Sequence, residues 1–170
     1  YCSDEEPYSN IYFSYKDSTG EYTSVEKVEG SLNGGFFTDV LGFSSDGEYM
    51  YIYENDGCTN LNPGDIYRSK RNSKGAWGTP KSLGSEVNSG YWESSASLTA
   101  DGELLYFVSE RLGGYGMSDI YVAERVGSKF KNVKNLGPVV NTDLRESTVT
   151  ISPDGNTLYF SSQGFDQNMG

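Results

Sequence analysis

The sequence predicts an all-β protein assembled from tandem copies of one four-stranded antiparallel unit. Three series of residues recur along the chain at spacings of 53 to 55 residues. They are the turn aspartates Asp46, Asp101 and Asp154, the tyrosines Tyr12, Tyr67 and Tyr121 that each follow an isoleucine, and the asparagines Asn33, Asn88 and Asn141. Several features that share one period indicate a single supersecondary unit copied in tandem.

The best-preserved copy contains four short strands. Small residues over 94–98 predict an innermost strand, and the apolar run over 104–109 is rich in β-forming residues. Between them, Asp101-Gly102 predicts a two-residue hairpin with a type I′ turn. Ranges 119–124 and 130–136 supply the third and fourth strands. Four strands in a unit of this length are typical of a β-propeller blade.

The phase of the repeat divides the chain within blades. Residues 1–35 are expected to end one blade, 36–87 and 88–140 to form the second and third, and 141–170 to begin a fourth. The chain therefore contains about three blades of an expected six-bladed propeller, a class that has about 4–8 blades. It is either a piece of a longer propeller or a chain that closes against a second copy by sharing the split blade.

The amino-acid composition argues against several classes of binding partner and against the most frequent catalytic groups. The chain of 170 residues has 13 basic and 24 acidic residues, a net charge of −11 and no histidine. An acidic chain is a poor ligand for nucleic acid or for an anionic membrane surface. No apolar run approaches the roughly 20 residues of a membrane-spanning helix. The absence of histidine removes the most frequent general base and zinc ligand.

Several motifs resemble a known family. They are Ser152–Ser162, Tyr106–Arg111, Gly113–Tyr121 and Asn135–Pro138, together with Asn141-Thr142. These motifs resemble the WD-like PD repeat of TolB-type propellers, most of all the version in OmpA-family outer-membrane proteins of Bacteroidetes. The PorE-like components associated with type IX secretion have such a propeller. The resemblance implies a six-bladed, cell-envelope scaffold at the periplasmic side of the outer membrane, next to a peptidoglycan-binding domain.

Catalysis has one candidate pair of residues. Glu93 and Glu146 occupy equivalent positions at the start of innermost strands, where the first copy has Thr38. Glycosidases need two carboxylates about 5–10 Å apart. A position repeated within one chain is more often structural, so we expect no enzymatic activity. The alternative is the propeller of a glycan-active enzyme or of a serine peptidase.

The sequence contains one candidate calcium-binding loop and two cysteines. Oxygen-bearing side chains gather there and could bind calcium, which accepts such ligands; they are Asn55, Asp56, Asn60, Asn62 and Asp65. Asn, Asp and Gly clusters are also ordinary turns, and no other cofactor is expected. Cys2 and Cys58 lie in equivalent loops and are either free thiols or a disulfide pair.

Binding of a protein, peptide or glycan is the function that the sequence favours. In a propeller, the loops between second and third strands share a face with the loops that join blades. That face is expected to collect Asn33, Phe37, Asn88, Tyr91, Trp92, Arg111, Tyr115, Asn141 and Arg145. Trp92 is equally well explained as a wedge between blades, and Arg145 and Arg111 as partners of Glu146 and Glu110. We therefore predict a non-catalytic module for protein–protein or peptidoglycan-associated interactions.

Overall fold

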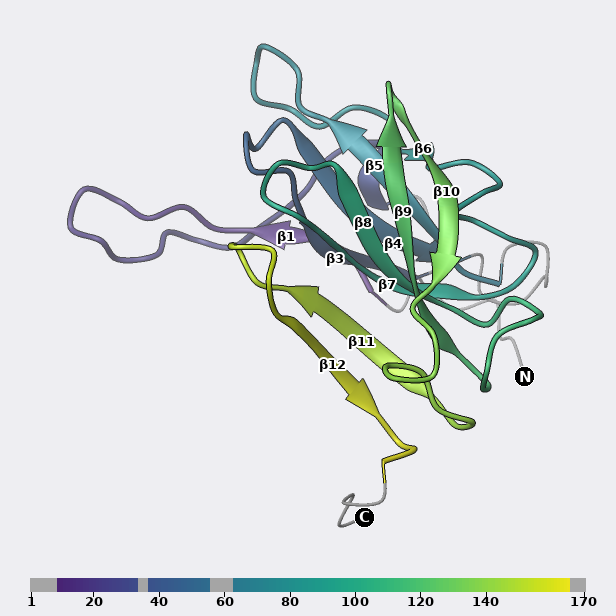
Figure 1. Ribbon diagram of the computed structural model, residues 1–170. Coiled ribbons are helices and arrows are strands. Elements are labelled where there is room, and N and C mark those ends of the chain that lie inside the picture. Colours follow the sequence, from purple (N-terminus) through teal and green to yellow (C-terminus); the bar gives the residue numbers. More distant parts are fainter. Residues whose placement is uncertain (1–8, 34–36, 56–62, 166–170) are drawn as a thin grey trace, which may run out of the picture.

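The computed structural model describes residues 9–33, 37–55 and 63–165. Strands dominate this part of the chain, and its only helical segment is a single 3-10 turn (Figure 1). The elements are β1 Tyr12–Phe13, β2 Glu26–Lys27, η1 Ser31–Asn33, β3 Phe37–Phe43, β4 Tyr49–Asn55, β5 Asp65–Lys70, β6 Lys81–Ser82, β7 Glu93–Leu98, β8 Leu104–Ser109, β9 Asp119–Val126, β10 Lys129–Asn135, β11 Glu146–Ile151 and β12 Leu158–Ser162.

These strands form two complete blades and two half-blades. The first full blade has the order β3-β4-β5-β6, and the second full blade has the order β7-β8-β9-β10. Among the described residues, strands β1 and β2 pair only with each other, as do β11 and β12. We call these pairs the N-terminal half-blade and the C-terminal half-blade. The prediction of four-stranded antiparallel propeller blades is confirmed.

Register identifies which half of a blade each half-blade represents. Phe107 lies opposite Tyr121 in the second full blade, and Ile52 lies opposite Tyr67 in the first. Tyr12 of β1 is the repeat equivalent of those two tyrosines, so β1 is a third strand and β2 a fourth. Strand β11 pairs with β12 as β7 pairs with β8, with a register shift near the start of both pairs. The C-terminal half-blade is therefore a first and a second strand.

The core lies between the blades. Buried aromatic and aliphatic side chains of the second full blade, led by Phe107 and Leu105, pack against Tyr51 and Ile66 of the first. Because each central strand has a blade on both sides, Tyr and Phe side chains fill both of its faces. At the inner end, Ser95 Oγ accepts a hydrogen bond from Val149 N at 3.2 Å. Small residues on β7 thus let neighbouring first strands approach closely.

The hairpin turns differ from the type I′ turns that the sequence predicts. In the second full blade, Gly102 N donates to Thr99 O at 2.8 Å, which closes a four-residue turn. Gly102 has φ +70°, whereas Asn132 is the only described non-glycine residue with positive φ. The aspartate is therefore not left-handed. Asp101 Oδ1 instead accepts bonds from Thr99 Oγ1 at 2.6 Å and from Glu103 N at 3.0 Å.

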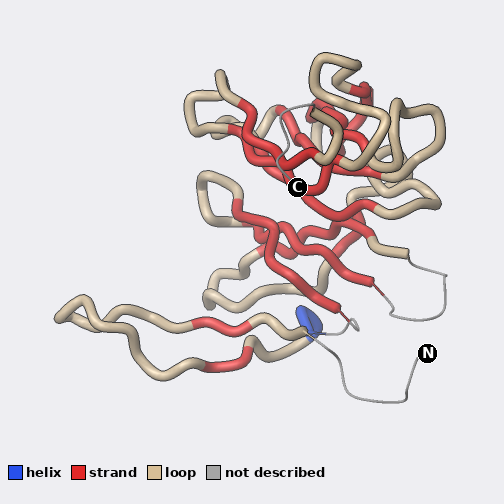
Figure 2. Tube along the Cα trace, turned by 90° about the horizontal axis from the view of Figure 1, so that it is seen from below, coloured by secondary structure: helices blue, strands red, loops and turns tan. Residues whose placement is uncertain are grey.

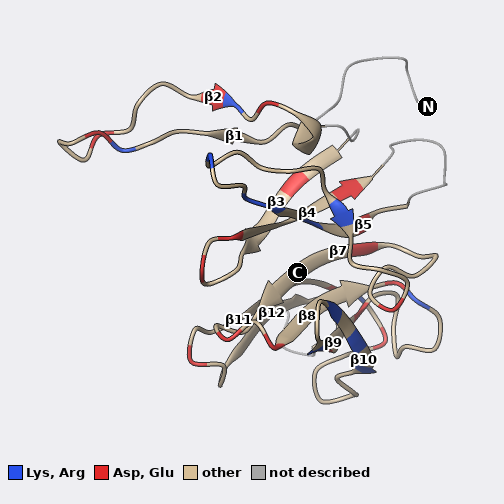
Figure 3. Ribbon diagram, turned by 90° about the horizontal axis from the view of Figure 1, so that it is seen from above, with Lys and Arg blue, Asp and Glu red and all other residues tan. Residues whose placement is uncertain are grey.

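Two features of the outer surface are plain in the figures. The hairpin that contains β1 and β2 projects from the body of the stacked blades (Figure 2). Asp and Glu residues are spread over several loops and strands, and Lys and Arg residues mark β5 and β10 (Figure 3). Within the described residues, no helix has the length and apolar character needed to cross a membrane.

Candidate functional site

Three loops meet at one end of the blades. They are residues 88–92 before β7, residues 110–118 between β8 and β9, and residues 136–145 before β11. Glu110 N donates to Trp92 O at 2.9 Å, and Met117 N donates to Leu144 O at 2.8 Å. These backbone bonds join all three loops, and we call the surface that they form the loop face.

Glycines allow the close approach of these loops. A Cβ on Gly116 would lie 2.3 Å from Leu144 O, and a Cβ on Gly114 would lie 1.9 Å from Asp119 Oδ2. Asp119 is buried and accepts bonds from Tyr115 N at 2.6 Å and from Gly116 N at 3.1 Å. The Gly-rich segment 113–116 is therefore held rigidly against the next loop.

Arg111 fastens the loop face to the blade behind it. Its guanidinium donates to Glu86 O at 3.0 Å and to Val87 O at 2.5 Å, and it lies 3.5 Å from Glu93 Oε1. It also stacks over the rings of Phe107 and Tyr121, at about 5 Å from each centroid. Arg111 therefore has a structural task that already uses its donors.

Arg145 and Trp92 each bond to a residue outside their own loop. Arg145 Nη1 donates to Glu110 Oε1 at 2.6 Å, whereas the sequence suggested Glu146 as its partner. Arg111 lies beside Glu93, whereas the sequence suggested Glu110. Trp92 Nε1 donates to Tyr53 Oη at 2.8 Å, which ties this loop to the first full blade. The indole ring remains 42% exposed, so it is both a bridge between blades and part of the surface.

The repeated asparagines complete the blades. Asn88 Oδ1 accepts from Ile66 N at 3.0 Å, and its Nδ2 donates to Ile66 O at 2.8 Å. Asn141 binds both backbone groups of Ile120 in the same way, and Asn33 binds those of Ile11. Each amide pairs the N–H of its isoleucine, and it shares the isoleucine C=O with a backbone N–H that follows the fourth strand. Their polar groups are occupied within the blade and do not belong to the exposed part of the loop face.

The candidate carboxylate pair is also built into the blades. Glu93 and Glu146 are both 0% exposed. Glu93 accepts from the hydroxyls of Ser89 and Ser109, each at 2.6 Å. Glu146 accepts from the hydroxyls of Thr142 and Ser162, each at 2.8 Å. Each carboxylate thus closes the turn before a first strand and links it to the second strand.

What remains exposed on the loop face is mostly apolar. Its exposed large apolar side chains are Tyr91, Trp92, Leu112, Tyr115, Met117, Val139 and Leu144, whose exposed fractions run from 41% to 86%. The predicted residues Tyr91, Trp92, Tyr115 and Arg145 lie on the three loops of this face. Leu112 and Met117 were missed by sequence reasoning, although their position inside the same Gly-rich loop was a usable signal.

Other predicted site residues lie outside this face or outside the described chain. Phe37 begins β3 and is half-buried, and it belongs to the preceding joint between blades with Asn33. Of the calcium candidates, Asn55 and Asp65 are described, and burial together with the charge of Glu93 raises the pKa of Asp65 to about 6. The remaining candidates and both cysteines, Asp56, Asn60, Asn62, Cys2 and Cys58, lie outside the described residues. Within 9–33, 37–55 and 63–165, no group of three acidic, His or Cys side chains is placed to hold a metal ion.

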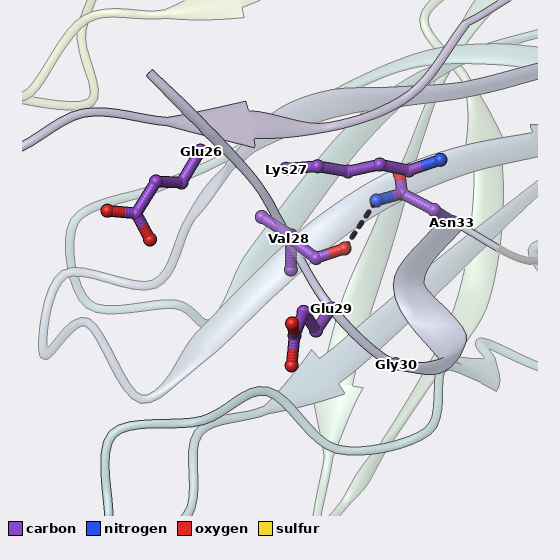
Figure 4. A pocket seen from close by; sticks show the side chains of 6 residues that line it. All are labelled: Glu26, Lys27, Val28, Glu29, Gly30 and Asn33. Carbon is purple, nitrogen blue, oxygen red and sulfur yellow. Dashed lines mark hydrogen bonds between the residues drawn. The ribbon is translucent and has the colours of Figure 1, made fainter. Parts of the chain in front are cut away.

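A cavity of about 740 Å³ lies by the N-terminal half-blade, away from the loop face (Figure 4). Six residues from one segment line it, and most of them are polar: Glu26, Lys27, Val28, Glu29, Gly30 and Asn33. Asn33 Nδ2 is held by Val28 O at 2.7 Å, which leaves it committed to the backbone. The side chains of Glu26, Lys27 and Glu29 point in different directions (Figure 4), so the cavity lacks the convergent polar groups of a small-molecule site.

Comparison with known proteins identifies the fold. No protein-family model matches the chain, and no curated protein matches it. TolB from Acinetobacter baumannii superimposes with a TM-score of 0.57 at 21% identity, over 89% of this chain and 31% of that one. A putative TolB from Agrobacterium tumefaciens gives a TM-score of 0.51 at 20% identity, over 88% of this chain and 48% of that one. This chain thus spans less than half the length of these two structures, and it has the TolB-like β-propeller fold.

Proposed function

We propose that the chain is part of a non-catalytic β-propeller that binds protein or peptide partners through the loop face. The observation that supports this most is a group of exposed aromatic and aliphatic side chains on backbone that is locked by hydrogen bonds between loops. Contiguous exposed apolar surface is typical of interaction sites, and Trp and Tyr are frequent binding hot spots.

The rigidity of the loop face favours affinity. Arg111, Asp119 and Gly116 fix the loop backbones before any partner arrives, so binding orders few additional groups. The Arg145–Glu110 ion pair lies beside the apolar residues and supplies a polar rim. With a net charge of −11, the chain favours partner segments that carry apolar side chains with neutral or basic neighbours.

We place this module in the cell envelope, at the periplasmic side of an outer membrane. The resemblance of its repeats to those of OmpA-family scaffolds of Bacteroidetes supports this location, as does the TolB-like fold. In this setting the partners are other envelope proteins, including peptidoglycan-associated or type IX secretion components. A calcium ion at the loop from Asn55 to Asp65 is a separate proposal, which calcium titration of the unfolding temperature tests.

The alternative is the propeller of a glycan-active enzyme or of a serine peptidase. It is the weaker proposal because Glu93 and Glu146, its candidate carboxylates, are buried and hydrogen-bonded within separate blades. Degradation of glycans or peptides by the purified chain, abolished by Glu93→Gln, would favour the enzyme.

A peptide-display experiment tests the binding proposal. A phage library of random 12-residue peptides is selected on the immobilised chain, and single peptides are then measured by interferometry. The Trp92→Ala/Tyr115→Ala variant should lose at least tenfold in affinity, since both rings leave the centre of the loop face. Tyr22→Ala is the matched control, because Tyr22 is 71% exposed but lies in the β1–β2 hairpin.

The outcomes separate the possibilities. Peptides that bind the parent and Tyr22→Ala equally, but not the double variant, support the loop face as the site. Peptides that bind all three chains with the same affinity place the interaction elsewhere and contradict the proposal.

A further inference from the structure

A groove lies between the outer strands of the two full blades. The first full blade and the turn after it line the groove with Arg68, Lys81 and residues 82–86, and the second full blade lines it with residues 128–131 of the β9–β10 hairpin. Its volume is about 380 Å³. Both walls belong to complete four-stranded blades, so the shape of the groove depends on their joint and not on either end of the chain. We call it the rim groove.

Two hydrogen bonds join the walls of the rim groove. Arg68 Nη2 donates to Ser128 O at 2.6 Å, which links β5 to the β9–β10 turn. Asn132 N donates to Glu86 Oε2 at 3.0 Å, which links β10 to the turn after β6. Because both bonds cross from one blade to the other, the groove is formed in advance, and a ligand that enters it orders few additional groups.

The side chains that line the rim groove carry an excess of positive charge. Four of the 13 basic residues of the chain are among them: Arg68, Lys81, Lys129 and Lys131. The acidic lining residue is Glu86, whose carboxylate already accepts a backbone N–H. None of the four basic residues has an ion-pair partner among the described residues, although the chain has 24 acidic residues. Their positive charge is therefore available to a ligand.

Protection of sheet edges explains only part of this pattern. Lysines on an outermost strand, such as Lys129 and Lys131 on β10, discourage pairing with another chain. Arg68 instead lies on β5, which has a strand partner on both sides. It also lies opposite Lys81 in the register of β5 and β6, and like charges directly opposite each other destabilise a sheet. A local rule that is broken in this way is typical of a functional site.

The rim groove favours an acidic peptide over a small anion. Its cations come from both walls, so a single small anion leaves part of the positive charge unused. The buried side chains of Leu83 and Phe130 add an apolar part to the lining. Carboxylates match the planar guanidinium of Arg68 in two-point hydrogen bonds. The net charge of −11 repels an acidic segment only weakly at physiological salt, where screening acts beyond about 8 Å.

We propose that the rim groove binds a segment of a protein partner in which Asp or Glu residues alternate with apolar residues. One carboxylate of the segment pairs with Arg68 and Lys81, and another pairs with the lysines of β10. An apolar side chain between them lies against Leu83 and Phe130. The rim groove and the loop face share no residue, so this second site does not depend on binding at the loop face.

Fluorescence anisotropy with two labelled peptides tests the proposal. The probe is the short peptide Gly-Glu-Leu-Glu-Leu-Glu-Gly, and the comparison peptide has Lys in place of each Glu. The chain should bind only the acidic peptide, and the affinity should fall as salt is raised. Arg68→Gln/Lys81→Gln should weaken binding at least about tenfold, because it removes the cations of one wall. Lys27→Gln/Lys74→Gln is the matched control, since it changes the net charge equally at exposed sites outside the rim groove.

A second variant separates binding from folding. Arg68 also holds Ser128 O, whereas Lys81 is exposed and its ammonium group has no partner among the described residues. Lys81→Glu should therefore keep the unfolding temperature of the parent and still weaken binding of the acidic peptide at least about tenfold.

Four results overturn the proposal. They are no binding of the acidic peptide by the parent chain, equal affinity of the parent and Lys81→Glu, equal losses in the two double variants, and complete displacement of the peptide by an equal concentration of inorganic phosphate. The last result would show a small-anion site instead. Trp92→Ala/Tyr115→Ala should bind the acidic peptide like the parent, so failure of the loop-face proposal and failure of this one are distinguishable.

Discussion

At the residue scale, the two full blades carry a buried glutamate on different strands. In the second full blade Glu93 lies on the first strand and faces Ser109 on the second. In the first full blade the hydroxyl residue, Thr38, lies on the first strand, and the carboxylate residue opposite it, Glu54, lies on the second. Thr38 Oγ1 and Glu54 Oε1 are both buried, and neither has a hydrogen-bond partner among the described residues. Without such partners, burial raises the pKa of Glu54 to about 7.

This carboxyl predicts a pH-dependent stability. In the unfolded chain Glu54 ionises near its ordinary value, whereas the folded chain retains the proton until about pH 7. The folded state therefore binds more protons between these values, and stability falls as pH rises through this window. Asp65, opposite Glu54 and with its pKa raised to about 6, acts in the same direction.

Glu54→Gln should remove most of this loss. We expect the variant to exceed the parent by about 1–3 kcal/mol in unfolding free energy at pH 8, and to match it near pH 4. Urea denaturation at four pH values measures the difference. Glu103→Gln, at an exposed turn, is the matched control and should change stability little at any pH. A constant difference across the pH range would contradict the assignment.

The repeated asparagine carries a second prediction. Asn88→Ala removes both side-chain bonds to Ile66 and leaves the buried N–H of Ile66 unpaired, whereas Ile66 O still accepts from Leu83 N at 3.2 Å. The expected cost is about 1–3 kcal/mol in unfolding free energy, the usual cost of one unpaired buried group. Asn156→Ala, in an exposed turn, should cost less than about 0.5 kcal/mol. Equal losses in thermal denaturation would show that Asn88 is not structural.

At the element scale, the hairpin between first and second strands is the most regular feature of the repeat. Gly47, Gly102 and Gly155 have φ between 68° and 73°. In each turn the aspartate two residues after Ser or Thr accepts from that hydroxyl, a bond that lowers the pKa of the carboxyl. The glycine supplies the left-handed residue, and the aspartate ties the turn ends together.

Replacement of the turn glycine tests this geometry. Gly102→Ala should destabilise the chain by about 1–2 kcal/mol, because its φ of +70° strains an alanine. The new Cβ would meet only the Arg125 guanidinium at 3.4 Å, so the cost is one of backbone conformation. Gly90→Ala is the matched control, with ordinary φ and open space around its Cβ. If chemical denaturation finds equal effects for both, the turn argument fails.

At the scale of the whole molecule, stability belongs to the joints between blades. Phe107 and Tyr51 are fully buried in one joint, and Ile120 and Val149 meet in the next. Repeat proteins of this kind derive their stability from nearest-neighbour interfaces.

Phe107→Ala is therefore expected to loosen two blades together. The cavity should cost about 3–5 kcal/mol. Hydrogen exchange measured by mass spectrometry should show faster exchange in both β4 and β8, which lie in different blades. Tyr12→Ala, at an exposed site on β1, is the control and should leave both strands protected. Faster exchange confined to β8 would contradict a stabilising joint.

The sequence by itself determined the repeat, the strands and the blade order, because turn chemistry and β-propensity act over a few residues and recur in every copy. It also predicted that Tyr91, Trp92, Tyr115 and Arg145 share one face. The type I′ turn was wrong because Asp101 binds its neighbours through its side chain and needs no positive φ.

Only the tertiary structure decided which of the repeated polar residues are internal. Nothing local distinguishes Asn88 or Glu93 from a surface residue, since their burial depends on a strand and a loop distant in sequence. The exposure of apolar residues also depends on the neighbouring blade. Val40 and Val149 occupy equivalent positions, but a neighbouring blade covers only Val149. The period of a repeat is a local property, whereas burial depends on what lies beside each copy.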